Sequence, residues 1–194
     1  MSRTRAEMIE ETRVKLLAAA RKAFRDSGYA AASMDELTAA AGLTRGALYH
    51  HFGDKQGLLA AVAAELDQEM DQRLQRISDA APDAWTALRE RCRAWLRMAT
   101  EPEIQRIALQ DARAVLGPAS EPAQQPCITS LTTLLQSLMD EGQVRAAEPQ
   151  ALARLINGAL MDGAFWIAAA PDDGERLEQA LRALDLLLDG LRQR

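Results

Sequence analysis

The chain has 194 residues, of which 48% are hydrophobic and 26% are charged. This length and composition predict a soluble protein with a buried core, and the scarcity of glycine and proline argues against an all-β fold. No apolar run approaches the length of a membrane span, and the N-terminus lacks the apolar core of a signal peptide. We therefore expect a cytoplasmic protein with no membrane partner.

Charge is divided unevenly along the chain. The net charge is −5, but residues 1–60 contain nine Lys and Arg against seven Asp and Glu, and the remainder has a balance of −7. Attraction to an anionic partner such as nucleic acid is thus local to the N-terminal part. Arg3 and Arg5 precede the first predicted helix. They either follow a DNA backbone or minor groove, or belong to a solvated terminus.

The first helix is predicted from about Thr4 to Ser27. Thr4 and Glu7 have the spacing of a capping box, and Gly28 is expected to end the helix. Apolar residues mostly three or four positions apart form one packed face. These residues are Ile9, Val14, Leu16, Leu17, Ala20 and Phe24.

Residues 33–59 predict two short helices joined by a tight turn. Ser33 and Glu36 have capping-box spacing, so a helix should begin at the next residue after Ser33. Gly42 is suited to the left-handed turn that ends this helix. Thr44 can cap a second helix that extends from Arg45 to about His51. This arrangement is typical of a helix-turn-helix, which places its second helix in a DNA major groove.

Each of these two short helices has an apolar side and a polar side. The expected apolar side consists of Leu37, Ala40, Ala41, Leu43, Leu48 and Phe52. Thr44, Arg45, Tyr49 and His50 point outward, where side chains near a helix N-terminus can contact base edges and phosphates. The alternative is an ordinary helical hairpin in an all-α core, with Arg45 and the histidines merely solvated.

A set of short motifs recurs in order through this region. They are Gly28-Tyr29, Ser33-Met34, Ala41-Gly42-Leu43-Thr44, Gly46-Ala47-Leu48-Tyr49, His51-Phe52, and Lys55 followed by Leu58-Leu59. With them, the chain from about Thr12 to Leu59 resembles the N-terminal DNA-binding domain of the TetR family of one-component transcriptional repressors. Thr38 stands where an alanine is usual, and we expect only a packing adjustment there. The predicted DNA-binding residues are Ser33, Met34, Thr44, Arg45, Gly46, Ala47, Tyr49, His50 and Lys55.

A long fourth helix is predicted from the cap Asp54 toward Ile77. The resemblance implies that Lys55 contacts phosphate and that this helix carries ligand-driven movement to the DNA-binding region. The alternative is a scaffold helix without a signalling role. We accordingly predict a helix-turn-helix domain over residues 1–53 and a ligand-binding and dimerisation domain over residues 54–194.

The remainder of the chain divides at helix-breaking residues. We predict helices over 83–99, over 103–115 either continuous or broken, over 129–141, over 149–169 and over 173–192, with a proline-containing loop from 117 to 126. Gly142 should end the third of these.

The last two helices contain more apolar residues than a single narrow core face requires. Small residues on the first of them would let another helix approach closely. The resemblance implies that the pair forms a four-helix dimer interface with its symmetry mate. The alternative is a hairpin used entirely by the core of one monomer. The predicted interface residues are Leu152, Leu155, Ile156, Ala159, Leu160, Gly163, Leu177, Leu181, Leu184 and Leu188.

Large or pliable apolar residues and a few polar ones in the central helices match the composition of a small-molecule cavity. Each of them is equally compatible with an ordinary core. The predicted ligand-binding residues are Trp95, Met98, Arg106, Gln110, Met139, Met161, Asp162, Phe165 and Trp166.

An enzyme is disfavoured, and no catalytic residue, metal or cofactor is predicted. His50 and His51 are adjacent and project in different directions, and the chain has no phosphate-binding glycine loop or catalytic triad context. Cys92 and Cys127 lie outside metal-ligand spacing, so reduced core thiols are expected, with a thiol sensor as the alternative.

The sequence thus predicts an all-α homodimeric transcriptional regulator. It would bind double-stranded operator DNA of near-palindromic sequence and be released from it, as a repressor, by an unidentified small-molecule effector. Activation in place of repression stays open. The alternative function is that of a helical small-molecule-binding or interaction protein without sequence-specific DNA binding.

Overall fold

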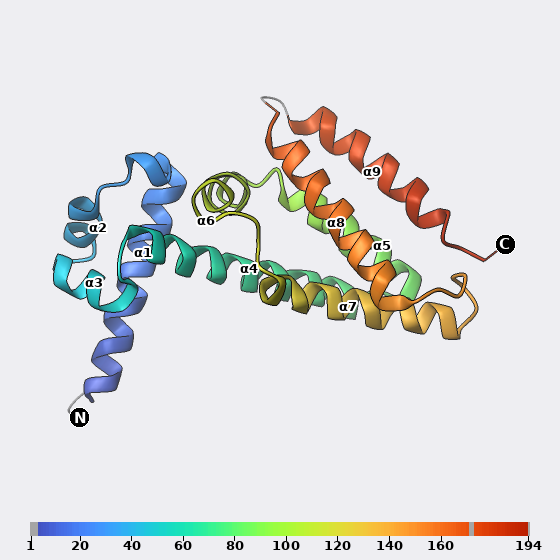
Figure 1. Ribbon diagram of the computed structural model, residues 1–194, viewed down its shortest axis with the longest axis horizontal. Helices are drawn as coiled ribbons and strands as arrows, with labels where there is room; N and C mark the ends of the chain where they lie inside the picture. Colours follow the sequence, from blue (N-terminus) through green and yellow to red (C-terminus); the bar gives the residue numbers. More distant parts are fainter. Residues whose placement is uncertain (1–3, 171–172, 194) are drawn as a thin grey trace. The chain divides into compact units, whose positions relative to one another are not determined.

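The computed structural model describes residues 4–170 and 173–193, so Arg3 lies outside the described residues. The described residues form helices and loops, with one isolated antiparallel bridge between Val144 and Arg192. Two compact units are present. The first contains the chain up to Asp67 together with Arg106–Pro118, and the second contains Gln68–Gln105 and the chain from Ala119 onward. The predicted all-α fold is confirmed (Figure 1).

The first unit is built around three N-terminal helices and the start of a fourth. Its elements are α1 (Arg5–Ala31), α2 (Met34–Ala40), α3 (Arg45–Phe52), the first half of α4 (Lys55–Asp79), most of the π-helix η1 (Ile104–Ala112), and α6 (Arg113–Leu116). Phe24, Leu48 and Leu58 are fully buried in its core. Ile107 of η1 is equally buried in that same core, although it follows α3 by a long stretch of chain. The N-terminal helices therefore share their core with η1.

Helix α1 begins as predicted but does not end as predicted. The Thr4 amide donates to Glu7 Oε2 over 2.7 Å and the Glu7 amide donates to Thr4 Oγ1 over 3.2 Å, which confirms the capping box. Gly28, with φ 77°, kinks the helix, and one more turn follows to Ala31. Gly28 therefore interrupts the regular helix as predicted, but the prediction missed the extra turn, which η1 supports on both sides of the kink.

Side chains of η1 satisfy the backbone groups that the kink frees. Asp111 Oδ2 accepts a hydrogen bond from the Tyr29 amide over 2.7 Å, and Arg106 Nη2 donates to the Ser27 carbonyl over 3.4 Å. Arg106 and Asp111 also form an ion pair of 3.5 Å. The φ of 77° favours glycine at this position, and a Cβ atom there would lie 1.8 Å from Arg106 Nη2, so any side chain would also displace the Arg106 guanidinium.

Two further expectations about helix termini were wrong. Ser33 is the N-cap of α2, but its side chain makes no capping hydrogen bond, so the second predicted capping box is absent. The loop predicted over 117–126 is shorter, because α7 (Glu121–Asp140) begins within it. Pro122 lies in the first turn of α7, where a backbone N–H has no helical partner in any case, and Pro126 is accommodated inside the helix.

The second unit is a set of packed long helices. Its elements are the second half of α4, α5 (Ala84–Met98), α7, α8 (Pro149–Ala168) and α9 (Asp173–Asp189). Helices α7 and α8 pack along each other, and α9 packs on both α5 and α8 (Figure 1). Helix α5 begins close to the predicted start, and Asp83 caps it, since Oδ1 accepts from the Thr86 amide over 2.8 Å. Gly142, with φ 69°, follows the end of α7.

Helix α4 is continuous across the division between the two units. The functional boundary predicted at residue 53 stays a prediction. Within the described ranges, none of the helices combines the length and the apolar character required to cross a bilayer.

Candidate nucleic-acid interface

The turn between α2 and α3 has the geometry of a helix-turn-helix. Gly42 adopts φ 65°, and the Leu43 amide donates to the Thr38 carbonyl over 2.8 Å, which closes the end of α2. Thr44 caps α3 as predicted, because Oγ1 accepts from the Ala47 amide over 3.3 Å. Leu48 is fully buried and fixes the inner face of α3 against the core. The opposite face of α3 consequently faces solvent.

Thr38 is buried beneath this turn, where the sequence predicted a packing adjustment. Its hydroxyl donates to the Met34 and Asp35 carbonyls at distances of 3.0 and 3.1 Å. The buried hydroxyl is therefore satisfied within its own helix. Ala40, which was assigned to the apolar side, is exposed instead, because α2 turns Leu37 and Thr38 toward the core.

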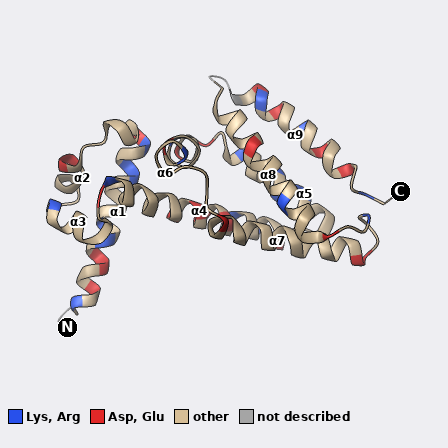
Figure 2. Ribbon diagram, viewed as in Figure 1, with Lys and Arg blue, Asp and Glu red and all other residues tan. Residues whose placement is uncertain are grey.

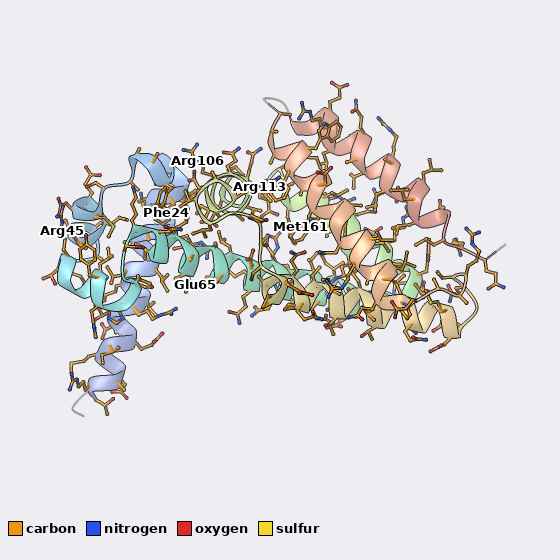
Figure 3. All side chains as sticks on the ribbon, viewed as in Figure 1. Phe24, Arg45, Glu65, Arg106, Arg113 and Met161 are labelled. Carbon is orange, nitrogen blue, oxygen red and sulfur yellow. The ribbon has the colours of Figure 1, made fainter. Side chains whose placement is uncertain are left out.

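Five of the predicted DNA-binding residues form a continuous exposed face. They are Thr44, Arg45, Gly46, Tyr49 and His50. The other four, which are half-buried, are Ser33, Met34, Ala47 and Lys55. In Figure 3, Arg45 lies beside α2 and α3, away from the core residue Phe24. The structure thus places the polar side of α3 where a DNA groove has access to it, but the individual contacts stay predictions.

Arg45 has a partner that the sequence analysis did not identify. Its Nε and Nη2 atoms donate to the two carboxylate oxygens of Asp35, a bidentate ion pair on an exposed surface. Hydrogen bonds to Asp35 raise the pKa of the Arg45 guanidinium further above its usual value. Asp35 lies in the first turn of α2 and Arg45 is the first residue of α3. A helix-turn-helix brings the starts of its two helices close together. An acidic residue in the first turn of α2 and an arginine at the start of α3 were therefore the sequence signal for this ion pair.

Lys55, predicted to contact phosphate, is anchored near the α1 kink. Its Nζ atom lies 4.6 Å from the centroid of the Tyr29 ring and donates to the Ala30 carbonyl over 3.5 Å. Burial raises the pKa of Tyr29, with a smaller contribution from the Asp54 carboxylate. Asp54 itself caps α4, because Oδ1 accepts from the Gly57 amide over 2.7 Å. The start of α4 is therefore fastened to the end of α1.

The second unit has an apolar groove between α8 and α9, with a volume of about 610 Å³. We call it the α8/α9 groove. Its lining includes Leu152, Leu155, Ile156, Ala159, Leu160, Gly163, Leu184 and Leu188, which are eight of the ten predicted interface residues. Leu155 and Leu187 in this groove are 72% and 63% exposed. The other two predicted interface residues are not among those that line the groove. Of these, Leu181 is buried inside the second unit, and the second is Leu177.

Figure 2 shows α8 almost free of charged residues. Only Arg154 and Asp162 carry charge along it.

The predicted effector residues do not meet in one place. Met98, Trp95, Met139, Met161 and Phe165 are buried or half-buried in the second unit, where Trp95 Nε1 donates to the Leu160 carbonyl over 3.2 Å. Asp162 and Trp166 line the α8/α9 groove. Arg106 and Gln110 belong to the first unit, where Arg106 supports the α1 kink. Effector contacts by these nine residues stay predictions.

The two cysteines are free thiols in the second unit. Burial raises the pKa of Cys92 from 9.0 to about 12, and burial also raises the pKa of Cys127. Both shifts favour the protonated thiol over the thiolate at neutral pH.

Comparison with known proteins identifies the family to which this chain belongs. Residues 16–62 match the family model described as "Bacterial regulatory proteins, tetR family". Residues 85–191 match "Tetracyclin repressor-like, C-terminal domain". The chain belongs to the TetR family. It is a DNA-binding transcriptional repressor with an N-terminal helix-turn-helix, as the sequence predicted.

Relatives within the TetR family cover the chain from end to end. A TetR-family transcriptional regulator from Pectobacterium atrosepticum is 60% identical, covers 99% of both chains and superposes with a TM-score of 0.93. The transcriptional repressor Rv1474c of Mycobacterium tuberculosis is 29% identical over 100% of both chains. The transcriptional repressor AcnR of Corynebacterium efficiens is 28% identical over 88% of both. At 21% identity and a TM-score of 0.66, RolR in complex with resorcinol shares the fold over 92% of this chain and 90% of its own.

Proposed function

We propose that this repressor acts as a homodimer, that α3 reads a near-palindromic operator, and that a small-molecule effector bound by the second unit releases it. The observation that carries the proposal is the exposed polar face of α3, which begins with Thr44 and Arg45 and is backed by the buried Leu48. A rigid helix that presents polar side chains near its N-terminus is suited to contacts with base edges in a major groove.

The α8/α9 groove supports the homodimer. Leucines that are more than half exposed, such as Leu155 and Leu187, lose unfavourable contact with water when a second copy covers them. A two-fold axis through this groove would pack α8 and α9 against the same helices of the partner, which is the usual form of a closed homodimer interface. Two such chains present two copies of α3, and a near-palindromic DNA site has the matching two-fold symmetry.

Release by an effector requires unequal binding to two states. A ligand shifts the equilibrium only by its difference in affinity for the DNA-bound and free conformations, and DNA must change ligand affinity by the same factor. Fold likeness to RolR, which is bound to resorcinol in its crystal structure, supports a small molecule as the effector class. The second unit, with its match to the repressor-like C-terminal domain, is the expected place of binding.

The function is tested by fluorescence anisotropy with promoter DNA that flanks the gene of this protein. We expect saturable binding of one dimer per site, competed by the same sequence and not by a scrambled one, and a footprint with two-fold symmetry. Candidate metabolites are then added to the complex. Equal competition by specific and scrambled DNA would contradict operator recognition, and binding of one chain per site would contradict the homodimer.

A further inference from the structure

Arg91 on α5 is the one charged side chain among the buried polar residues of the described chain, and it is only 3% exposed. Its neighbours one helical turn away include Leu88 and Trp95, so it lies on the apolar side of the helix. The other arginines of α5 are paired at the surface. Arg89 and Arg93 contact Asp185, and Arg97 contacts Glu90.

The guanidinium of Arg91 is only partly satisfied by the protein. Its Nε and Nη1 atoms are both buried and have no hydrogen-bond partner among the described residues. Loss of hydration without a compensating hydrogen bond is strongly unfavourable for a charged group. A retained buried arginine with unused donors therefore suggests that a further molecule completes its hydrogen bonds.

Two side chains of the second unit interact with Arg91. Asp71 on α4 is half-buried; burial raises its pKa, and the nearby Arg91 charge opposes that rise. On α7, the charge of Arg91 and a hydrogen bond from it lower the pKa of Cys127, against the larger effect of burial. Neither side chain accepts a hydrogen bond from Nε or Nη1 of Arg91. The guanidinium thus has neighbours on α4 and α7, but its Nε and Nη1 donors stay available.

We propose that Arg91 binds the carboxylate group of the effector, an inference that rests on the proposed effector function of the second unit. The planar guanidinium offers N–H donors that match the two oxygens of a carboxylate. The half-buried Trp95, one helical turn from Arg91, provides apolar surface for the organic part of such a ligand. The nearby Asp71 carboxylate repels a dianion more than a monoanion, which favours a carboxylate over a phosphate.

The test compares wild-type protein with Arg91→Met, which keeps a long unbranched side chain and removes the charge. Melting temperature is measured with acetate, propionate and benzoate, and with the corresponding neutral amides, at constant ionic strength. We expect the carboxylates, and not the amides, to raise the melting temperature of the wild type. Arg91→Met should bind the carboxylates at least about tenfold more weakly. The surface variant Arg97→Met is the matched control and should respond as the wild type does.

Two further variants sharpen the result. Asp71→Asn removes a competing negative charge and should tighten carboxylate binding. In the absence of carboxylate, Arg91→Met should melt at or above the wild-type temperature, because it removes an unsatisfied buried charge. A lower melting temperature would show that Arg91 is already satisfied inside the protein and would overturn the proposal. So would equal carboxylate responses of wild type and Arg91→Met, or no carboxylate response in the wild type.

Operator affinity, measured in parallel, separates this inference from the proposed function. If carboxylates bind through Arg91 but operator affinity does not change, the carboxylate site stands and the effector role of the second unit fails. If carboxylates do not bind while the protein still recognises its operator, the carboxylate site fails and the repressor function stands. Weaker operator binding with carboxylate in the wild type, and no change in Arg91→Met, would support both.

Discussion

Arg45 at the start of α3 and Asp35 in the first turn of α2 form a bidentate ion pair on the exposed face of the helix-turn-helix. Both side chains are more than half exposed, so the pair contributes little to folding. Its effect is on DNA binding, because it orients the Arg45 guanidinium and places a carboxylate beside it. To contact a base, the Arg45 guanidinium must either break its hydrogen bonds to Asp35 or keep them and use its other N–H donors.

Replacement of Arg45 by alanine should weaken operator binding by roughly tenfold to a hundredfold if the side chain reads a guanine. Thermal stability should change little. Tyr49→Phe should instead weaken binding to all DNA sequences evenly, as loss of a phosphate contact would. Anisotropy titrations with operator and scrambled DNA measure both effects. Unchanged affinities in both variants would exclude α3 as the recognition helix.

Asp35→Asn should increase the affinity for non-operator DNA severalfold, because it frees Arg45 and removes a negative charge that faces phosphate. Glu36→Gln is a matched control, since it makes the same charge change in the same turn of α2 without a partner in α3. The measurement is non-specific binding as a function of salt concentration. The role given to the ion pair would be refuted by equal effects of the two variants.

The dimer prediction uses two adjacent exposed leucines of α9. Leu187 lines the α8/α9 groove, whereas Leu186, which is 76% exposed, does not. Leu187→Glu should convert a dimer to a folded monomer, because dimerisation would bury an unpaired charge. Leu186→Glu should leave the dimer intact. Sedimentation velocity at micromolar concentration checks both, and a monomeric wild type would disprove the interface.

Gly57 in the first turn of α4 has no room for a side chain. A Cβ atom there would lie 2.0 Å from the Phe52 carbonyl oxygen. Gly57→Ala should therefore lower the free energy of unfolding by about 1–3 kcal/mol. Gly46→Ala is the control, because its nearest contact would be an ordinary 3.7 Å and alanine favours helix by about 0.5–1 kcal/mol. Urea denaturation tells the two apart, and equal stabilities would contradict the close approach.

The Cys92 thiol should make the folded state less stable at alkaline pH. Its pKa is raised from 9.0, the ordinary value expected in the unfolded chain, to about 12 in the folded protein, so the unfolded chain loses its proton first as pH rises. The contribution of Cys92 to stability is complete below the unfolded pKa and is lost as pH rises toward the folded value. From about pH 8 to about pH 10, the advantage of wild type over Cys92→Ala should shrink by about 1–2 kcal/mol. A constant difference in urea unfolding would refute the shift.

Features that depend on residues a few positions apart were predictable from the sequence. The caps at Thr4, Thr44 and Asp54 each use a side chain and an amide three residues later, so the pattern alone locates them. Gly42 likewise signals its own turn. These local rules gave the helix order and the exposed face of α3.

Features that depend on packing between distant segments were not predictable. Gly28 has the local properties of a helix terminator, and only the contacts of Tyr29 and Ser27 with η1 explain why the helix continues. Arg91 resembles the other arginines of α5 in sequence. Its place between Leu88 and Trp95 on the apolar side was the available signal, but burial of its guanidinium is decided by neighbouring helices.

The burial of Ile107 in the core of the first unit has a consequence for synthesis of the chain. A nascent polypeptide leaves the ribosome from its N-terminus, and domains generally fold in that order. Here the helix-turn-helix emerges long before Ile107 and the Asp111 carboxylate that holds the Tyr29 amide. We expect the nascent segment to reach its final packing only after η1 has left the exit tunnel, and a fragment that stops at residue 53 to be much more easily proteolysed than the full chain.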